Sequence, residues 1–176
     1  EHSFCWMGRS FKNHVGAIQM KMDSEVYFMT IAFAAATRST CPRRSVGAVL
    51  IANKRVVSTG YNGAPSGFRE CINGGCVMFQ DADRERCINT VHAEVNALTS
   101  AHTKGDLLVC TDAPCINCVK NALAHNVDIK IIYARDYTDA ARDVFLKENG
   151  MEDRLIKFDS RRLGRILSLM EQEISK

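Results

Sequence analysis

TVHAEVNAL, residues 90–98, places a histidine and a glutamate two positions apart at the predicted start of a helix. A lone histidine on a helix is more often a core or surface residue than a metal ligand. Further along the chain, PCINC at residues 114–118 directly follows a predicted strand, and proline is favoured at a helix entry. The two stretches therefore predict two helices that begin with residues able to hold a metal ion.

The thiols of Cys115 and Cys118 lie on the first turn of the predicted second helix. Cysteines three apart point to the same side, and the positive end of the helix dipole favours the thiolate form that metals require. Taken alone, a Cys-x-x-Cys pair is equally compatible with a redox pair, half of a structural zinc site, or a catalytic metal site.

His92 supplies a third ligand if the two helix N-termini converge on one ion. Three protein ligands leave one coordination position open, which is the arrangement of a catalytic rather than a structural zinc. Zinc lowers the pKa of a bound water toward neutrality, so a hydroxide nucleophile is expected at working pH. Glu94, beside the site but not required as a ligand, is then the predicted proton carrier.

The rest of the chain alternates between predicted strands and helices. A helix over 24–38 precedes a hairpin of two β-branched strands, and the segment from 63 to about 89 is a long loop rich in glycine and cysteine. Strands and helices then alternate to the end, with strands at 107–111, 129–134 and 155–158, and helices from 92, at 115–125, 138–149 and 161–174. This order predicts an α/β fold, a three-layer α/β/α sandwich on a mixed five-stranded sheet.

The 176 residues suit one domain over 23–176, preceded by an extension over 1–22 of unknown role. No apolar run approaches the length of a membrane span, and polar residues interrupt the first segment too often for a signal-peptide core. A formal net charge of +3 is typical of an ordinary enzyme. We therefore expect a cytoplasmic protein that does not contact a membrane and does not bind nucleic acid.

His-Ala-Glu followed by Pro-Cys-Ile-Asn-Cys resembles the motif of the zinc-dependent nucleobase deaminases. The resemblance implies that His92, Cys115 and Cys118 hold the zinc. It also implies that Glu94 takes a proton from the water, then protonates the ring nitrogen and finally the departing ammonia.

STCPRRSVGAVL and STGYNGAPSG, with TVHAEVNAL, narrow the resemblance to the deoxycytidylate (dCMP) deaminase family and the related bacterial late-competence proteins. It covers about residues 23–158 and implies a cytidine deaminase-like fold, with Asn62, Ala93 and Tyr137 as substrate contacts. From the residues alone, the alternative is that Asn62 is only a turn residue, because asparagine tolerates a left-handed turn. The implied reaction is the hydrolysis of dCMP to dUMP and ammonia, a step of pyrimidine nucleotide biosynthesis.

The family resemblance also implies a second, structural zinc. After Cys115 and Cys118 are set aside, four cysteines surround the long loop: Cys41, Cys71, Cys76 and Cys87. Four thiolates form a closed tetrahedral site that would hold a segment with little core of its own. The alternative is that free cysteines pack as small apolar residues. Cys110 is expected in the core, and Cys5 is unassigned.

Arg43 and Arg44 are candidates for binding the 5′-phosphate, although exposed arginines are common on protein surfaces. Asp136 follows a predicted strand, at the edge where open α/β sheets present their binding sites. A shortened TSAHTKGD link, Cys110 and Ala113 depart from the family pattern and bear on substrate choice.

Two other functions fit parts of the sequence. A tRNA adenosine deaminase shares the zinc motif but should carry a basic surface, which a net charge of +3 does not favour. A noncatalytic, competence-type zinc module would have no use for Glu94. The resemblance further implies a homo-oligomer with dCTP and dTTP as candidate allosteric effectors, and the sequence leaves both open.

Overall fold

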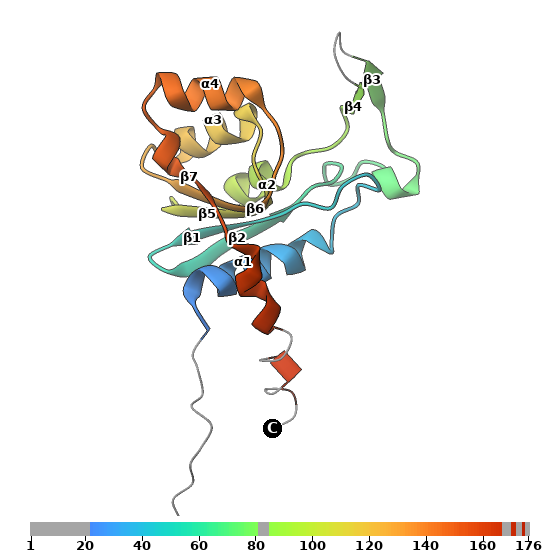
Figure 1. Ribbon diagram of the computed structural model, residues 1–176. Helices are drawn as coiled ribbons and strands as arrows, with labels where there is room; N and C mark the ends of the chain where they lie inside the picture. Colours follow the sequence, from blue (N-terminus) through green and yellow to red (C-terminus); the bar gives the residue numbers. More distant parts are fainter. Residues whose placement is uncertain (1–21, 81–84, 167–169, 172–173, 175–176) are drawn as a thin grey trace, which may run out of the picture.

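The computed structural model describes residues 22–80, 85–166, 170, 171 and 174. A five-stranded sheet with the order β2-β1-β5-β6-β7 forms the middle layer, and helices cover both of its faces (Figure 1). The predicted three-layer sandwich on a mixed sheet is therefore confirmed. The predicted extension over 1–22 lies, except for residue 22, outside the described residues.

The sheet is antiparallel on one side and parallel on the other. β1 (Gly47–Ala52) pairs antiparallel with β2 (Arg55–Tyr61) and with β5 (Leu107–Asp112). β6 (Lys130–Arg135) and β7 (Leu155–Lys157) then continue parallel to β5. Asn53 and Lys54 join β1 to β2 with positive φ values of 52° and 63°, the conformation of a tight hairpin turn that matches strand twist.

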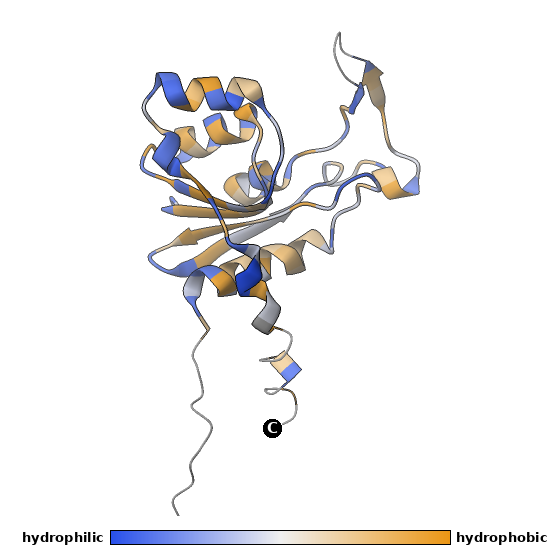
Figure 2. Cartoon of the chain, viewed as in Figure 1, coloured by the Kyte–Doolittle hydropathy of each residue, from blue (hydrophilic) through white to orange (hydrophobic). Residues whose placement is uncertain are grey.

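Each face of the sheet buries its own apolar layer. On one face, α2 (Ala93–Thr99), α3 (Ile116–His125) and α4 (Ala140–Glu148) pack against residues such as Leu50, Leu108 and Ile131. On the other face, α1 (Ser24–Ala36) and the 3-10 helix η3 (Ser160–Arg165) pack against their sequence neighbours Val49, Val109 and Ile132. The central strands β1, β5 and β6 are therefore apolar on both sides, and Figure 2 shows the apolar middle layer.

Two glycines allow helices to approach the sheet closely. A Cβ on Gly60 would lie 2.2 Å from the carbonyl oxygen of Ala93 in α2. A Cβ on Gly47 would lie 2.0 Å from the carbonyl oxygen of Ala32 in α1, on the opposite face. The position of α2, whose first turn carries the candidate site, thus depends on a missing side chain in β2.

The cysteine-rich loop projects from the sandwich as a separate arm, residues 64–90 (Figure 1). It contains the 3-10 turn η1 (Cys71–Asn73) and a short hairpin of β3 (Met78–Gln80) and β4 (Glu85–Cys87). Gly63 and Val91 close its base with two backbone hydrogen bonds of 3.2 and 2.8 Å. The predicted loop therefore has some secondary structure of its own.

The predicted elements are found at or near the observed positions, with two corrections: the hairpin in the arm was not predicted, and the C-terminal helix begins differently. The terminal helix predicted over 161–174 begins as the 3-10 helix η3, and another 3-10 turn, η2 (Glu152–Arg154), precedes β7. Asp159, whose carboxylate accepts from the amide of Arg161, starts η3. The apolar spacing that predicted this helix does not distinguish a 3-10 turn from an α-helix. Within the described residues, no helix has the length and apolar character needed to cross a bilayer.

Candidate metal centre and active site

His92, Cys115 and Cys118 converge at the adjoining ends of α2 and α3. His92 and Cys115 occupy the N-cap positions of the two helices. Nδ1 of His92 lies 3.2 Å from Sγ of Cys118 and 3.6 Å from Sγ of Cys115, and the two sulfurs are 3.6 Å apart. Zinc bonds of about 2.0 Å to nitrogen and 2.3 Å to sulfur, in tetrahedral geometry, separate neighbouring ligands by about 3.5–3.8 Å. The three side chains therefore fit a zinc ion.

The environment of the two thiols favours one thiolate. The hydrogen bond with Cys118, and then the contact with His92, lowers the pKa of Cys115 to about 4. The same hydrogen bond, followed by burial, raises the pKa of Cys118. The thiolate is the form of cysteine that binds metals, and a helix N-terminus beside a histidine favours it.

Glu94 points from the first turn of α2 into the same site. The residue is 4% exposed, and its carboxyl group lies close enough to His92, Cys115 and Cys118 to interact with them. Burial raises the pKa of the Glu94 carboxyl above its usual value. A carboxyl group shielded from bulk water beside a metal site is suited to carrying protons.

A cleft of about 520 Å³ opens onto these residues. Its lining comes from several parts of the fold: the loop before β1, the end of β2, the arm, the starts of α2 and α3, and the segments that follow β5 and β6. The lining includes Arg43, Arg44, Asn62, Arg86, Cys87, His92, Ala93, Glu94, Cys115, Tyr137 and Asp139. The volume is in the range of small-molecule sites.

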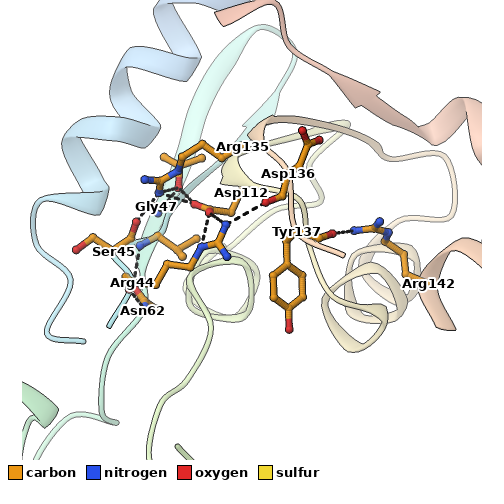
Figure 3. A network of polar contacts seen from close by, with 11 residues as sticks. Arg44, Ser45, Gly47, Asn62, Asp112, Arg135, Asp136, Tyr137 and Arg142 are labelled. Carbon is orange, nitrogen blue, oxygen red and sulfur yellow. Dashed lines mark hydrogen bonds and ion pairs between the residues drawn. The ribbon is translucent and has the colours of Figure 1, made fainter. Parts of the chain in front are cut away.

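Two arginines share one buried carboxylate at the edge of the cleft (Figure 3). Asp112, which is 4% exposed at the end of β5, accepts from Arg44 Nε at 2.6 Å and from Arg135 Nη2 at 2.6 Å. Thr111 also donates its hydroxyl to Asp112 at 2.7 Å. One carboxylate facing two guanidinium groups leaves a local positive excess, and Arg44 lies in the cleft lining.

Asn62 is buried and holds the loop before β1. Its Oδ1 accepts from the Ser39 hydroxyl at 2.6 Å and from the Val46 amide at 2.8 Å, while Nδ2 donates to the Arg44 carbonyl at 2.8 Å. Asn62 does not have a positive φ, so the left-handed alternative does not apply. One N–H of its amide group has no partner among these contacts, and Asn62 lines the cleft.

The other residues predicted to lie near the substrate are not all directed into the cleft. Tyr137 lines the cleft, and the Arg44 guanidinium carbon lies 5.4 Å from the centroid of its ring. Ala93 lines the cleft with its side chain buried. Asp136 directs its carboxylate to Lys157, away from this network, and only its carbonyl accepts from Arg44, at 3.2 Å. Arg43 lines the cleft and donates toward Met78 in the arm.

A second group of cysteines gathers in the arm. Cys71, Cys76 and Cys87 place their sulfurs within 4.8 Å of one another, with 3.8 Å between Cys71 and Cys87. Burial opposes ionisation of Cys87, but hydrogen bonds from Thr90 and the Asn89 backbone lower its pKa to about 6. Cys41 is not part of this group, although it and Cys87 both line the cleft. Cys110 is fully buried in β5, as predicted.

Four polar residues near the site were not singled out in the sequence: Asp112, Arg135, Asp139 and Arg142. Asp112 and Arg135 end buried strands, where a charged residue after an apolar run is a recognisable sign of a site. Asp139 and Arg142 look like ordinary polar residues of an amphipathic helix, and nothing in their spacing indicates their contacts.

Comparisons with known proteins agree on one protein family. A family model described as the cytidine and deoxycytidylate deaminase zinc-binding region matches residues 22–134. The chain is 39% identical over 116 residues to ComE operon protein 2 of Bacillus subtilis, covering 63% of this chain and 59% of that protein. It is 37% identical over 125 residues to the deoxycytidylate deaminase of Mycobacterium phage D29, covering 65% of this chain and 96% of that protein.

A solved structure agrees with these relatives. The dCMP deaminase of cyanophage S-TIM5, in complex with dCMP and dUMP, superposes with a TM-score of 0.61 at 27% identity, covering 79% of this chain and 99% of that one. Other curated relatives are longer: the match spans only 46% of the Saccharomyces cerevisiae deoxycytidylate deaminase. The matched segment runs from α1 to β6 and includes His92, Cys115 and Cys118, and the chain belongs to the cytidine and deoxycytidylate deaminase family.

Proposed function

We propose that this protein is a zinc-dependent hydrolase that converts dCMP and water to dUMP and ammonia. The observation that carries the proposal is Glu94, a buried carboxyl group in contact with the His92, Cys115 and Cys118 group at the cleft. A purely structural zinc site has no need of a proton carrier beside it.

His92, Cys115 and Cys118 would hold the zinc, which supplies Lewis acidity that makes water a nucleophile near neutral pH. Glu94 accepts the proton that the water loses as its oxygen bonds to C4 of the cytosine ring. The same carboxyl group passes this proton to the ring nitrogen. It then takes the proton of the new C4 hydroxyl group and delivers it to the departing amino group, so that the C4–N bond breaks, the C4 carbonyl forms and ammonia leaves. Burial of Glu94 excludes bulk water from these proton transfers.

The choice of dCMP as substrate rests on the phage relatives and on the charge at the cleft. The cyanophage structure contains dCMP and dUMP. In this chain, Arg44 stacks near Tyr137 and is held by Asp112 at the cleft edge. We infer that Arg44 binds the 5′-phosphate and that the remaining amide N–H of Asn62 donates to the sugar, with Ala93 and Tyr137 against the nucleoside.

We further propose that Cys71, Cys76 and Cys87 hold a second, structural zinc, with Cys41 as the predicted fourth ligand. The distance of 3.8 Å between the sulfurs of Cys71 and Cys87 supports such a site. Homo-oligomer formation and regulation by dCTP and dTTP stay predictions of the family resemblance.

The test is to follow ammonia release by the purified protein from dCMP, dCTP, deoxycytidine and an adenosine-containing RNA hairpin. We expect turnover of dCMP above all, with changes when dCTP or dTTP is added if the protein is regulated. Turnover of another compound with dCMP untouched would contradict the substrate assignment. No turnover of any compound, with zinc bound, would favour a noncatalytic role like that considered for competence-type relatives.

A further inference from the structure

Two residues of α4 contact the turn that carries Cys115, although α4 contributes no ligand to the proposed zinc site. Asp139 is the N-cap residue of α4, and Arg142 lies in its first turn. Both reach across to the segment between β5 and α3. Asp139 also lines the cleft, and the contacts of the two residues join the proposed zinc site to a helix on the same face of the sheet.

Arg142 joins the two sides of the cleft through a single nitrogen atom. Its Nη1 donates to the carbonyl of Pro114 at 3.1 Å and to the carbonyl of Tyr137 at 3.0 Å (Figure 3 shows the second contact). Pro114 precedes Cys115, and Tyr137 lines the cleft. Arg142 is 7% exposed, and Asp143 balances its charge through an ion pair of 2.7 Å. A buried guanidinium with this set of partners has little freedom to move.

Asp139 uses its two carboxylate oxygens on two different helices. Oδ1 accepts from the Arg142 amide at 3.0 Å, which caps α4. Oδ2 accepts from the Ile116 amide at 3.0 Å, at the start of α3. Cys115 is the N-cap of α3 and makes no side-chain capping bond, so Asp139 supplies the acceptor that this amide would otherwise lack. The thiol of Cys115 thereby remains available to a metal.

We propose that Asp139 and Arg142 are positioning residues that fix the Cys115 turn and couple it to the Tyr137 wall of the cleft. Asp139 holds the amide immediately after Cys115, and Arg142 holds the carbonyl immediately before it. The orientation of Cys115 toward His92 is therefore set from both sides by α4. This inference rests on the proposed zinc site and not on the identity of the substrate.

The first test separates the two roles of Asp139. In Asp139→Ser, the hydroxyl retains the cap of α4 but is too short to reach Ile116, so α4 should stay folded while the Cys115 turn loosens. The zinc-loaded protein is treated with a chelator and an alkylating agent, and the reaction of each cysteine is followed in its own peptide. We expect Cys115 and Cys118 to react about 10- to 100-fold faster in the variant than in the parent protein. Alkylation of Cys71 and Cys87 should not change. Equal rates for Cys115 in the variant and the parent protein would overturn the role of Asp139.

The second test removes the bridge between the two sides. Arg142→Met should accelerate alkylation of Cys115 and also amide hydrogen exchange over residues 135–139. Arg154→Met is the matched control, because Arg154 also donates to a backbone carbonyl, that of Asp128 at 2.7 Å, but does not line the cleft. If Arg142→Met and Arg154→Met give the same rates of Cys115 alkylation and of hydrogen exchange over residues 135–139, Arg142 does not couple the Cys115 turn to Tyr137.

The outcome does not depend on which compound is deaminated. If dCMP is not a substrate but the two variants release Cys115 as expected, the proposed function fails and the positioning role stands. If dCMP is a substrate, Asp139→Ser should lower kcat at unchanged KM, whereas Arg142→Met should also raise KM because Tyr137 is released. Normal kinetics with unchanged alkylation in both variants would overturn the positioning role alone.

Discussion

The carboxyl group of Glu94 lies in the first turn of α2 with little exposure to solvent and contacts Cys118. Because it is next to the proposed ligands but is not one of them, we expect Glu94→Gln to lower kcat by about 100- to 10,000-fold, the usual contribution of a general acid–base group. The variant should keep its zinc at the level of the parent protein. Retained activity, measured as ammonia release, would rule out the proton-carrier role.

Arg44 and Arg135 offer a matched pair for testing phosphate recognition. Both bind Asp112, but only Arg44 is in the cleft lining. We expect Arg44→Gln to raise KM for dCMP by at least about tenfold, since a charge-assisted contact is worth more than about 1.4 kcal/mol. KM for deoxycytidine, which has no phosphate, should hardly change.

The control for this prediction is Arg135→Gln. It removes the same type of ion pair from Asp112 while leaving the cleft lining intact, so the ratio of KM values for the two compounds should stay as in the parent protein. An equal change in this ratio for both arginine variants would mean that Asp112, and not the phosphate, accounts for the effect.

The sequence identified the site residues that lie in short motifs, because the spacing within each motif indicates the chemistry. His92 and the two cysteines begin helices, and a helix start fixes where a side chain points, so their convergence was predictable once two helices were placed side by side. Asp112 with Arg44 was not predictable in this way, because the contact joins residues 68 positions apart. The three-cysteine group without Cys41 likewise depends on how the arm folds, which short spacing does not show.

At the level of elements, the separation of α2 from the sheet depends on Gly60. Its Cβ position lies 2.2 Å from a backbone oxygen and 2.5 Å from a backbone nitrogen of α2, so Gly60→Ala must displace the helix. We expect the free energy of unfolding to fall by about 1–3 kcal/mol, measured by urea denaturation. Activity should fall further than stability alone explains, because α2 carries His92 and Glu94.

Gly47→Ala and Gly164→Ala are the controls for Gly60→Ala. Gly47 packs against α1 on the face of the sheet that lacks the site, so its substitution should cost similar stability and leave KM and kcat of the folded protein unchanged. Gly164 has open space around its Cβ position and should change stability by less than about 0.5 kcal/mol. Equal loss of activity in the two sheet glycine variants would contradict a specific link between Gly60 and the site.

Strands and helices were predictable where apolar periodicity was strong, as in β1, β5 and α3. The boundaries were less so: the helix predicted over 138–149 is observed as Ala140–Glu148, with Asp139 as its cap. The C-terminal segment begins as a 3-10 turn after its N-cap residue Asp159, and apolar spacing does not distinguish such a turn from an α-helix. The arm hairpin was missed because β3 and β4 are only three residues each.

At the scale of the whole molecule, the arm and the sandwich each contain a cysteine group. We expect two zinc ions per chain by elemental analysis, and one in Cys87→Ser. The variant should keep the zinc at His92, but the arm, with little apolar core, should be cleaved more rapidly in limited proteolysis. A single zinc in the parent protein would show that the arm cysteines are merely packed thiols.

The role of Cys41 can be decided by the same measurement. If Cys41 is the fourth ligand, Cys41→Ser should release the second zinc to a chelator faster than the parent protein does. Cys110→Ser is the control, because Cys110 is buried in β5 and belongs to neither group. Retention of the second zinc in Cys41→Ser would leave Cys71, Cys76 and Cys87 as the protein ligands.

The base of the arm is closed by the two hydrogen bonds between Gly63 and Val91, directly before His92. The entry and exit of the arm are thus fixed to each other, whatever lies between them. Residues 64–90 can therefore be replaced as a unit. We expect an arm of another length, taken from a relative and inserted between Gly63 and Val91, to leave the start of α2 in place. Chimeras of this kind would allow the rim of the cleft to be varied while the chemistry at its floor is kept.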